Sequence, residues 1–457
     1  MQYTHINQKH INFFIKQLGE KNILVGDSCN DYGSDETENL NYPPELVLFP
    51  SSEKEVSEIL YYCNNNSIAV TPSGALTGLS GGAIPVFGGV SLSMKRMNKV
   101  LSIDEKNFQA TIEPGLINEE FQNILTERKL FYPPDPASKG TCTLGGNFAL
   151  NAGGPKAVKY GVTSNYILNL EVVLPNGEIF WTGANTLKNA TGYNLTQLII
   201  GSEGTLAVIT KAVLKLIPLP SYRTLLLVPF IDNYEACDAV AEIMHQGIIP
   251  SALEFMESEA IRFVKNQSYA EIPFSLNSNI SSYLLIELDG NNKNQLLIDS
   301  EKIYHILAKY HCGEILFADS ELEQERIWKV RRSIGIAVKA FSIYKEEDTV
   351  VPRASLATLL MGVKDIGKEY GFKSICYGHA GDGNLHVNIL KDGLTDHEWK
   401  NILNHAIRKI FKLCVDLGGT ISGEHGIGLV QKEYMDIPLS DENLNLQKKL
   451  KTIFDPN

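Results

Sequence analysis

The segment 377–389, YGHAGDGNLHVNI, places His379 and His386 on either side of a glycine-rich turn. Because Asp-Gly favours a tight reversal of the chain, the segment predicts a β-hairpin. Imidazole nitrogens are common ligands of zinc, manganese and iron. Two histidines alone fit a structural pair at least as well as half of a metal site, so the hairpin by itself leaves both interpretations open.

The strand after the turn predicts which side chains are presented together. Leu385, Val387 and Ile389 fall on one face of this strand, whereas His386 and Asn388 fall on the other. Since the aliphatic face is expected in the core, the opposite face should present a histidine beside an amide.

A second glycine-rich segment, GGTISGEHGIG at 418–428, places Glu424 and His425 side by side on a loop before a helix-like stretch. Two histidines and one carboxylate can hold a divalent cation and leave coordination positions for a substrate or water. Glu424 therefore completes a candidate metal site with His379 and His386, and His425 becomes the candidate base.

Glycine-rich segments also recur in the first half of the chain. The first, PSGALTGLSGG at 72–82, follows a short apolar segment, and its glycines allow backbone N–H groups to converge on an anion. It matches neither GxxxxGK[ST] nor GxGxxG, which argues against an ordinary nucleoside triphosphate site or a Rossmann dinucleotide site. Read alone, it fits a surface loop equally well.

The order of these segments is more specific than any one of them. The segments at 72–82, 133–161 and 201–210 together resemble the FAD-binding domain of the vanillyl-alcohol oxidase/p-cresol methylhydroxylase (PCMH) superfamily, over about 42–220. The resemblance implies that the first segment holds the FAD pyrophosphate. It places 135–161 along the ribityl chain and the isoalloxazine ring, and 203–209 at the adenosine side.

The residues that this resemblance implies for FAD binding are Pro72, Ser73, Gly74, Ala75, Leu76, Thr77, Gly78, Leu79, Ser80, Pro134, Asp135, Thr143, Gly145, Gly146, Asn147, Ala152, Gly153, Gly154, Tyr160, Gly161, Glu203, Gly204, Val208 and Ile209. Some members attach FAD covalently through a histidine in the first loop. This chain has no histidine there, so we expect non-covalent FAD.

The segments GHAGDGNLHVN and GGTISGEHGIG resemble the C-terminal domain of FAD-linked D-2-hydroxyacid dehydrogenases. With the FAD domain, the resemblance extends over about 42–455. It implies that His379, His386 and Glu424 hold a divalent metal (zinc, manganese or iron). By the same resemblance, Asn388 contacts the substrate and His425 is the catalytic base.

The motif Trp328-Lys-Val-Arg331 resembles the family's Trp-x-x-Arg, whose arginine binds the substrate carboxylate. A guanidinium suits this bidentate contact, although a structural surface arginine is the alternative. Lys345 is a weaker candidate for a second carboxylate contact, because its spacing differs by one residue. Gly335 stands where hydroxyglutarate enzymes have a substrate-binding threonine, which weakens the case for that substrate.

These resemblances predict FAD-dependent oxidation of a small D-2-hydroxy acid to the 2-oxo acid, by metal-assisted hydride transfer to flavin N5. The segment 347–355, EDTVVPRAS, looks closer to the glycolate oxidase subunit than to the hydroxyglutarate enzyme, which favours D-lactate or glycolate. Three alternatives stay open: a D-2-hydroxyglutarate dehydrogenase-like enzyme, a redox-neutral alkyl-transfer flavoenzyme of the same fold, and a non-catalytic flavin-binding subunit.

The pattern of predicted helices and strands changes near residue 220. The first half predicts helices at 53–64, with a Ser52–Glu55 capping box, and at 118–130, and a hairpin of 168–174 with 178–182. The second half alternates strands (225–228, 282–288, 313–317) with helices (233–246, 295–311, 322–340, 357–370, 397–417), which suggests helices packed on one face of a sheet.

The expected fold class is α+β, in three parts. A helical lead-in occupies 1–41, and a two-part FAD-binding domain of the PCMH type occupies 42–220. A ferredoxin-like α+β domain with C-terminal helices, expected to carry the substrate and metal sites, occupies 221–457. Relatives usually continue past Phe-Asp-Pro-Asn with a segment resembling Asn-Pro-Gly-Lys, so either the chain is shortened or a last strand is missing.

Composition limits the partners. A net charge of −12 argues against nucleic-acid binding and requires a local positive charge if the substrate is an anion. No apolar run is long enough to cross a membrane and the N-terminus lacks a signal peptide, so we expect a cytoplasmic protein, with peripheral contact to the inner face of the membrane left open. Seven cysteines without a Cys-x-x-Cys pair place any iron–sulfur or other electron-accepting group on a partner protein.

Overall fold

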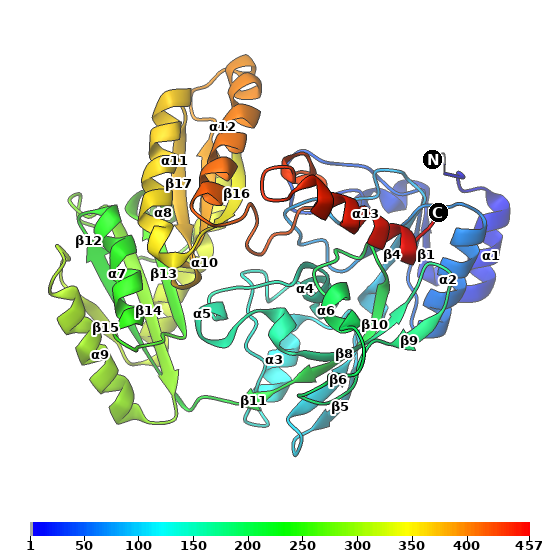
Figure 1. Cartoon of the computed structure of the whole chain (residues 1–457), viewed down its shortest axis with the longest axis horizontal. Coiled ribbons are helices and arrows are strands. Elements are labelled where there is room, and N and C mark those ends of the chain that lie inside the picture. Colours follow the sequence, from blue (N-terminus) through cyan, green and yellow to red (C-terminus); the bar gives the residue numbers. More distant parts are fainter. Residues whose placement is uncertain (1–2) are drawn as a thin grey trace. The chain divides into compact units, whose positions relative to one another are not determined.

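The computed structural model describes residues 3–457, which form two compact units (Figure 1). The first unit comprises the chain up to Gly153, Val162–Leu219 and Glu424–Asn457. The second unit comprises Gly154–Gly161 and Pro220–Gly423. No helix within residues 3–457 is both long enough and apolar enough to cross a bilayer.

The first unit begins with a four-stranded sheet. Its strands are β1 (Ile23–Val25), β2 (Leu46–Leu48), β4 (Val90–Ser93) and β3 (Val70–Ser73), in that order, and their core is shared with helices α1 (Gln8–Leu18) and α2 (Glu53–Asn65). Ser52 caps α2 by accepting a hydrogen bond from the N–H of Glu55. The Glu55 carboxylate, however, accepts from the N–H of Ser51, so the predicted capping box is displaced by one residue.

A five-stranded antiparallel sheet follows in the first unit. Its order is β5 (Val100–Asp104), β6 (Gln109–Ile112), β10 (Val208–Lys215), β8 (Ile167–Val173) and β9 (Ile179–Trp181), and the β8–β9 pair confirms the predicted hairpin. The helix expected at 118–130 ends earlier, as α3 (Asn118–Thr126), because β7 (Leu130–Phe131) pairs with β11 (Ile217–Pro218). Three more helices belong to this unit: α4 (Leu144–Leu150), α6 (Leu195–Ile199) and α13 (Asp441–Phe454).

The second unit is built on a seven-stranded antiparallel sheet. The strand order is β15 (Leu316–Ala318), β12 (Tyr222–Phe230), β14 (Ser282–Gly290), β13 (Ala252–Glu257), β17 (Lys373–Gly378), β18 (Asn384–Leu390) and β16 (Tyr344–Val350). Its helices are α5 (Ala157–Tyr160), α7 (Asn233–His245), α8 (Ser258–Asn266), α9 (Lys293–Leu307), α10 (Glu321–Phe341), α11 (Leu356–Tyr370) and α12 (Asp396–Asp416). The alternation expected in the second half is confirmed, with boundaries shifted by a few residues.

The two faces of this sheet are covered differently. Helices α8 and α10 pack on the face that carries Leu225, Met256 and Tyr283, and they share one core cluster with it. Helices α7, α9, α11 and α12 contact the strands and one another (Figure 1). The expectation of helices on a single face is therefore wrong: α8 and α10 lie on the opposite face, where their apolar side chains complete the core.

Candidate functional site

The predicted histidine hairpin is formed by β17 and β18. The chain reverses at Ala380–Asp382, and Gly383 takes a φ of +84°, a left-handed conformation that favours glycine. The rings of His379 and His386 are both buried, with their centroids 5.3 Å apart and nearly perpendicular. The hairpin thus brings the two histidines together.

The alternation predicted for β18 is also confirmed. His386 pairs in register with Tyr377 of β17 and Asp348 of β16, while Asn388 pairs with Glu346. Cross-strand partners share a face of a sheet. These side chains therefore share one face of the sheet, with the aliphatic residues Leu385, Val387 and Ile389 buried on the other.

Arg331 lies on α10 and is held by Glu254 of β13. Its Nε donates to Glu254 Oε2 at 2.8 Å, and its Nη2 forms an ion pair with the same oxygen at 2.7 Å. The same carboxylate contacts the Nδ1 of His379, at 2.8 Å from Oε1 and 3.0 Å from Oε2. One buried carboxylate therefore holds the predicted substrate arginine and a predicted metal ligand.

The charge on Glu254 is maintained by these partners. Burial alone would raise the pKa of this carboxyl, but the charges of His379 and Arg331 and their hydrogen bonds bring the pKa below its usual value. A carboxylate only accepts hydrogen bonds, so Nδ1 of His379 carries a proton, and the lone pair of the neutral imidazole lies on Nε2. Nε2 is thus the atom of His379 that can bind a metal.

Trp328 is anchored in a parallel way, one turn before Arg331. Its Nε1 donates to Glu287 of β14 at 2.8 Å, and Ser251 Oγ donates to the same carboxylate at 2.8 Å. Lys156, the residue before α5, forms an ion pair with Glu287. The Trp-x-x-Arg motif is therefore fixed to the sheet through two buried glutamates on neighbouring strands.

Tyr377 lies among the predicted substrate residues. The guanidinium carbon of Arg331 is 5.1 Å from the centre of its ring, and the ring of His386 is 5.4 Å away. Burial and the charge of Glu346 raise the pKa of Tyr377 well above its usual value, so the phenol stays protonated. Its hydroxyl lies 3.3 Å from the position that a Cβ on Gly335 would take.

Asn388 is fully buried beside these groups. Its Nδ2 donates to the carbonyl of Ile375 at 3.4 Å, while its Oδ1 accepts no hydrogen bond from any residue between 3 and 457. A buried polar atom without a partner is costly, and a bound molecule is one way to satisfy it. Lys345 pairs with Ile389, which puts it on the opposite face of the sheet from Asn388. The structure does not bring Lys345 to this site.

The loop that leads to Glu424 is tied to β16. Asp348 Oδ2 accepts hydrogen bonds from Ser422 Oγ at 3.0 Å and from the N–H of Gly423 at 2.8 Å. Its Oδ1 accepts from Asn384 Nδ2 at 2.7 Å, at the start of β18. Asp348 therefore fixes the residue before Glu424 as well as the strand that carries His386.

Glu424 and His425 begin the last segment of the first unit. A Cβ on Gly153 would lie 2.8 Å from Glu424 Oε2, so this carboxylate lies against a backbone expected to line the flavin. Glu203 accepts hydrogen bonds from the N–H groups of Ile427 and Gly428, each at 2.8 Å. After His425 the chain forms a turn, in which the N–H of Gln431 donates to the carbonyl of Ile427 at 3.0 Å, and then a short 3-10 helix, Lys432–Tyr434.

The glycines expected at FAD allow close approaches within the first unit. A Cβ on Gly74 would lie 2.3 Å from Thr143 Oγ1, and one on Gly145 would lie 2.5 Å from Pro114 Cβ. The carbonyl of Ser80 accepts from the N–H of Leu429 at 2.8 Å. The segments 72–82, 141–147 and 201–210 are thus packed with the 426–430 loop in one unit.

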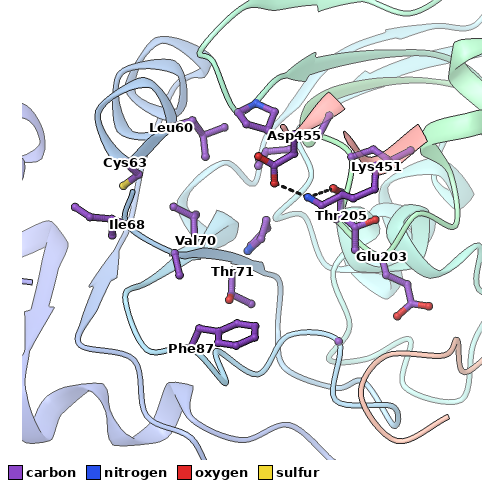
Figure 2. Close-up of a pocket in the computed structure, with 18 of the residues that line it drawn as sticks. Leu60, Cys63, Ile68, Val70, Thr71, Phe87, Glu203, Thr205, Lys451 and Asp455 are labelled. Carbon is purple, nitrogen blue, oxygen red and sulfur yellow. Dashed lines mark hydrogen bonds and ion pairs between the residues drawn. The ribbon is translucent and has the colours of Figure 1, made fainter. Parts of the chain in front are cut away.

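A cavity of about 520 Å³ lies between the first and last of these segments. Its lining includes Pro72, Gly81, Glu203 and Thr205, all from the segments expected at the pyrophosphate and adenosine ends of FAD. Lys451 of α13 also lines it and donates to the carbonyl of Thr205 at 2.9 Å (Figure 2). A cavity of this size lined by glycine-rich backbone is what the binding of a dinucleotide requires.

The residues expected at FAD do not all belong to the first unit. Gly154, Tyr160 and Gly161 belong to the second, where the hydroxyl of Tyr160 lies 2.9 Å from both carboxylate oxygens of Asp289. Lys159 also forms an ion pair with Asp289. This short segment is therefore fastened to the strand that carries Glu287.

Three site residues escaped the sequence analysis: Glu254, Glu287 and Tyr377. One signal was present for Glu254. It stands in the middle of ALEFME, a six-residue strand that is buried throughout. A carboxylate in such a strand is rare unless a cation or a donor pairs with it.

Both halves of the chain match families of known proteins. Residues 44–183 match the family described as "FAD binding domain", and residues 219–457 match "FAD linked oxidases, C-terminal domain". The chain is 38% identical to a D-lactate dehydrogenase of Anaerostipes hadrus over 465 residues, covering 100% of this chain and 97% of that protein. It is also 38% identical to the glycolate oxidase subunit GlcD of Bacillus subtilis, covering 93% of this chain and 89% of that protein.

A solved structure of p-cresol methylhydroxylase shares the fold. It superposes with a TM-score of 0.75 at 18% identity, covering 99% of this chain and 96% of the other. This likeness supports the predicted PCMH-type, mixed helix-and-sheet fold.

Proposed function

This chain belongs to the family of FAD-linked oxidases, and we propose that it oxidises a small D-2-hydroxy acid, of the lactate or glycolate class, to the 2-oxo acid. The observation that carries the proposal is the gathering of Arg331, Tyr377, His386 and Asn388 in the second unit, on one face of the sheet and the helix over it. This set offers a cation, an imidazole and an unsatisfied amide oxygen to one small anion.

Arg331 is the group proposed to bind the substrate carboxylate. Its polar contacts with Glu254 are a hydrogen bond from Nε and an ion pair from Nη2. The remaining Nη1 can donate to a carboxylate, and the guanidinium supplies the local positive charge that a protein of net charge −12 needs. Asn388 Oδ1 is placed to accept the hydrogen bond of a substrate hydroxyl.

His379, His386 and Glu424 are the residues proposed to hold a divalent cation. The donor set of two imidazoles and a carboxylate suits zinc, manganese or iron. The Nδ1 of His379 is bonded to a carboxylate, as metal-bound histidines commonly are, which supports this assignment. A bound cation supplies Lewis acidity, which lowers the pKa of a hydroxyl group that it contacts.

The glycine segments of the first unit are proposed to hold FAD without a covalent link. The cavity beside Thr71 and Glu203 and the close approach of Gly74 to Thr143 support this placement. Bound FAD supplies the acceptor of the substrate Cα hydride, at flavin N5. His425 removes the hydroxyl proton, so that the carbon–oxygen bond becomes the carbonyl of the 2-oxo acid.

Electrons must then leave to an acceptor, and we propose that it lies on a partner such as an iron–sulfur protein. All seven cysteines are free thiols, and none within residues 3–457 belongs to a group of side chains spaced to hold a metal. Within residues 3–457 the cysteines therefore offer no iron–sulfur site.

Two alternatives are less well supported. A hydroxyglutarate enzyme needs room and a polar partner for a second carboxylate, but the hydroxyl of Tyr377 lies against Gly335, where that partner would stand. A redox-neutral alkyl-transfer enzyme needs no cluster for a 2-hydroxy acid, yet Arg331 and Asn388 are both buried and preorganised here.

The proposal is tested by mixing metal-replete holoenzyme anaerobically with D-lactate, L-lactate, glycolate and D-2-hydroxyglutarate. We expect D-lactate or glycolate to bleach the flavin, and bleaching by none of the four acids would show the proposed function to be wrong. His425→Asn should slow flavin reduction by about 10²–10⁴-fold with FAD content unchanged. His397→Asn, on the exposed side of α12, serves as the control and should keep the wild-type rate.

A further inference from the structure

We propose that Glu254 is the positioning residue of the site, and that its single carboxylate couples binding of the substrate carboxylate by Arg331 to binding of the metal by His379. This inference rests on the proposed function and names a residue that acts through two others. It starts from the position of Glu254 at the centre of β13, with no exposed surface.

The geometry makes the two contacts interdependent. Oε2 accepts from Nε of Arg331, forms an ion pair with its Nη2 and lies 3.0 Å from His379 Nδ1, while Oε1 lies 2.8 Å from the same nitrogen. Three nitrogen atoms thus converge on two oxygens that are fixed by a strand. If Arg331 or His379 moves, the carboxylate moves away from the other of the two, because both of its oxygens already make contacts.

The contacts also define what each partner presents to the site. With Nε and Nη2 bound to Glu254, the guanidinium plane of Arg331 is held and Nη1 is left for the substrate. With Nδ1 protonated toward Glu254, His379 keeps its Nε2 lone pair for the cation. Hydrogen bonds of this kind raise the basicity of a ligand imidazole and fix its ring, and removing them typically weakens metal binding by about 10–100-fold.

A purely structural role makes a different prediction. The same strand carries Glu257, a second buried carboxylate, which pairs with Lys364 at 2.8 Å and accepts from the N–H of Cys376 at 2.8 Å. Because it lies three residues along the strand from Glu254, Glu257 points to the opposite face of the sheet. Loss of charge at either glutamate should lower stability, but only Glu254 should alter metal and substrate binding.

The experiment compares Glu254→Gln, Glu254→Asp and the control Glu257→Gln in the full-length holoenzyme. Zn²⁺ affinity is measured by competition with a chromogenic chelator, which needs no turnover, and KM and kcat are measured with the best acid. Glutamine has no charge to pair with Arg331 and only one accepting oxygen, so Glu254→Gln should weaken Zn²⁺ binding at least tenfold and raise KM about tenfold. Glu254→Asp, which keeps the charge, should recover part of both losses.

Each outcome decides a separate point. If Glu254→Gln and Glu257→Gln lower the melting temperature alike while Zn²⁺ affinity and KM stay within twofold of wild type, Glu254 is structural and the inference is wrong. Wild-type protein that takes up no Zn²⁺ overturns the metal site and the inference with it. Wild-type protein that binds Zn²⁺ but is reduced by no acid overturns the proposed function alone, because the Zn²⁺ titrations still decide the role of Glu254.

Discussion

The hydroxyl of Tyr377 occupies the space beside Gly335, 3.3 Å from where a Cβ would stand. Gly335 lies one helical turn beyond Arg331, on the side of α10 that faces the sheet. Any side chain at this position must displace Tyr377, which in turn contacts Arg331 and His386. The glycine and the tyrosine therefore limit the size of the acid that Arg331 can hold.

Gly335→Thr is expected to raise KM for the best acid by about tenfold, since overpacking a buried site commonly costs about 1–3 kcal/mol. Ile336→Thr, at the next and exposed position of α10, is the control and should leave KM unchanged. Steady-state kinetics with the flavin content matched between variants provides the measurement.

Removal of the Tyr377 hydroxyl should relieve the same clash. When Tyr377→Phe is introduced together with Gly335→Thr, we expect KM to return a substantial part of the way to the wild-type value. The effects of substitutions at neighbouring residues that share one space are not additive. If the effects of the two substitutions on KM are strictly additive as free energies, Gly335 and Tyr377 do not jointly limit the size of the site.

Glu203 is expected to position the loop of His425 rather than to bind FAD through its carboxylate. Its two oxygens accept from the N–H groups of Ile427 and Gly428. Glu203→Gln leaves one N–H without an acceptor, a loss of about 1–3 kcal/mol. Flavin reduction should slow by about 10-fold or more, while bound FAD per chain stays at the wild-type level.

Glu45→Gln is the matched control for Glu203. Glu45 also accepts from two backbone N–H groups, those of Ile6 and Gly89, far along the chain from His425. Stopped-flow reduction at the wild-type rate is expected for this variant. Loss of FAD from Glu203→Gln, with normal reduction in the remaining holoenzyme, would contradict the positioning role.

The histidine hairpin could be predicted from the sequence because its rules are local. Asp-Gly specifies the turn, and the period of two assigns His386 and Asn388 to one face. The chain has no comparable local rule for Glu254, whose partners lie 77 and 125 residues away, on α10 and in the β17–β18 turn. Only the assembled sheet reveals that one carboxylate serves both.

Other long-range contacts of the site could not be predicted either. Glu203 accepts from the N–H groups of Ile427 and Gly428, more than two hundred residues later in the chain. Likewise, nothing near Lys156 or Tyr160 in the sequence indicates that they bond Glu287 and Asp289 of β14. Long-range polar contacts of this kind leave no periodic pattern.

Gly145→Ala should weaken FAD binding. A methyl group on Gly145 would meet Pro114 at 2.5 Å from Cβ and 3.0 Å from the carbonyl oxygen, so α4 must move away from the segment that it packs on. We expect purified Gly145→Ala to retain less than about a tenth of the wild-type FAD, since overpacking costs about 1–3 kcal/mol. Gly290→Ala, where the nearest atom is Leu296 Cδ2 at 3.6 Å, should keep its FAD.

His311 gives the second unit a pH-dependent contact. Its Nδ1 lies 2.7 Å from Glu235 Oε1, at the first turn of α7. This hydrogen bond and the charge of Glu235 raise the pKa of His311 above its ordinary 6.5, and the bonds from His311 lower the pKa of Glu235. A raised histidine pKa means that the folded state holds the proton more tightly than the unfolded state.

The stabilisation from His311 should therefore be fully present below pH 6.5 and be lost as the pH rises through the higher pKa of the folded state. His311→Gln is expected to melt below wild type at pH 6, by a small shift on the order of 1–2 °C, and together with wild type at pH 9. In a Glu235→Gln background the same substitution is the control and should cause no pH-dependent shift, because the carboxylate that His311 contacts has been removed. A His311→Gln deficit that is equal at pH 6 and pH 9 would show that the imidazole charge plays no part.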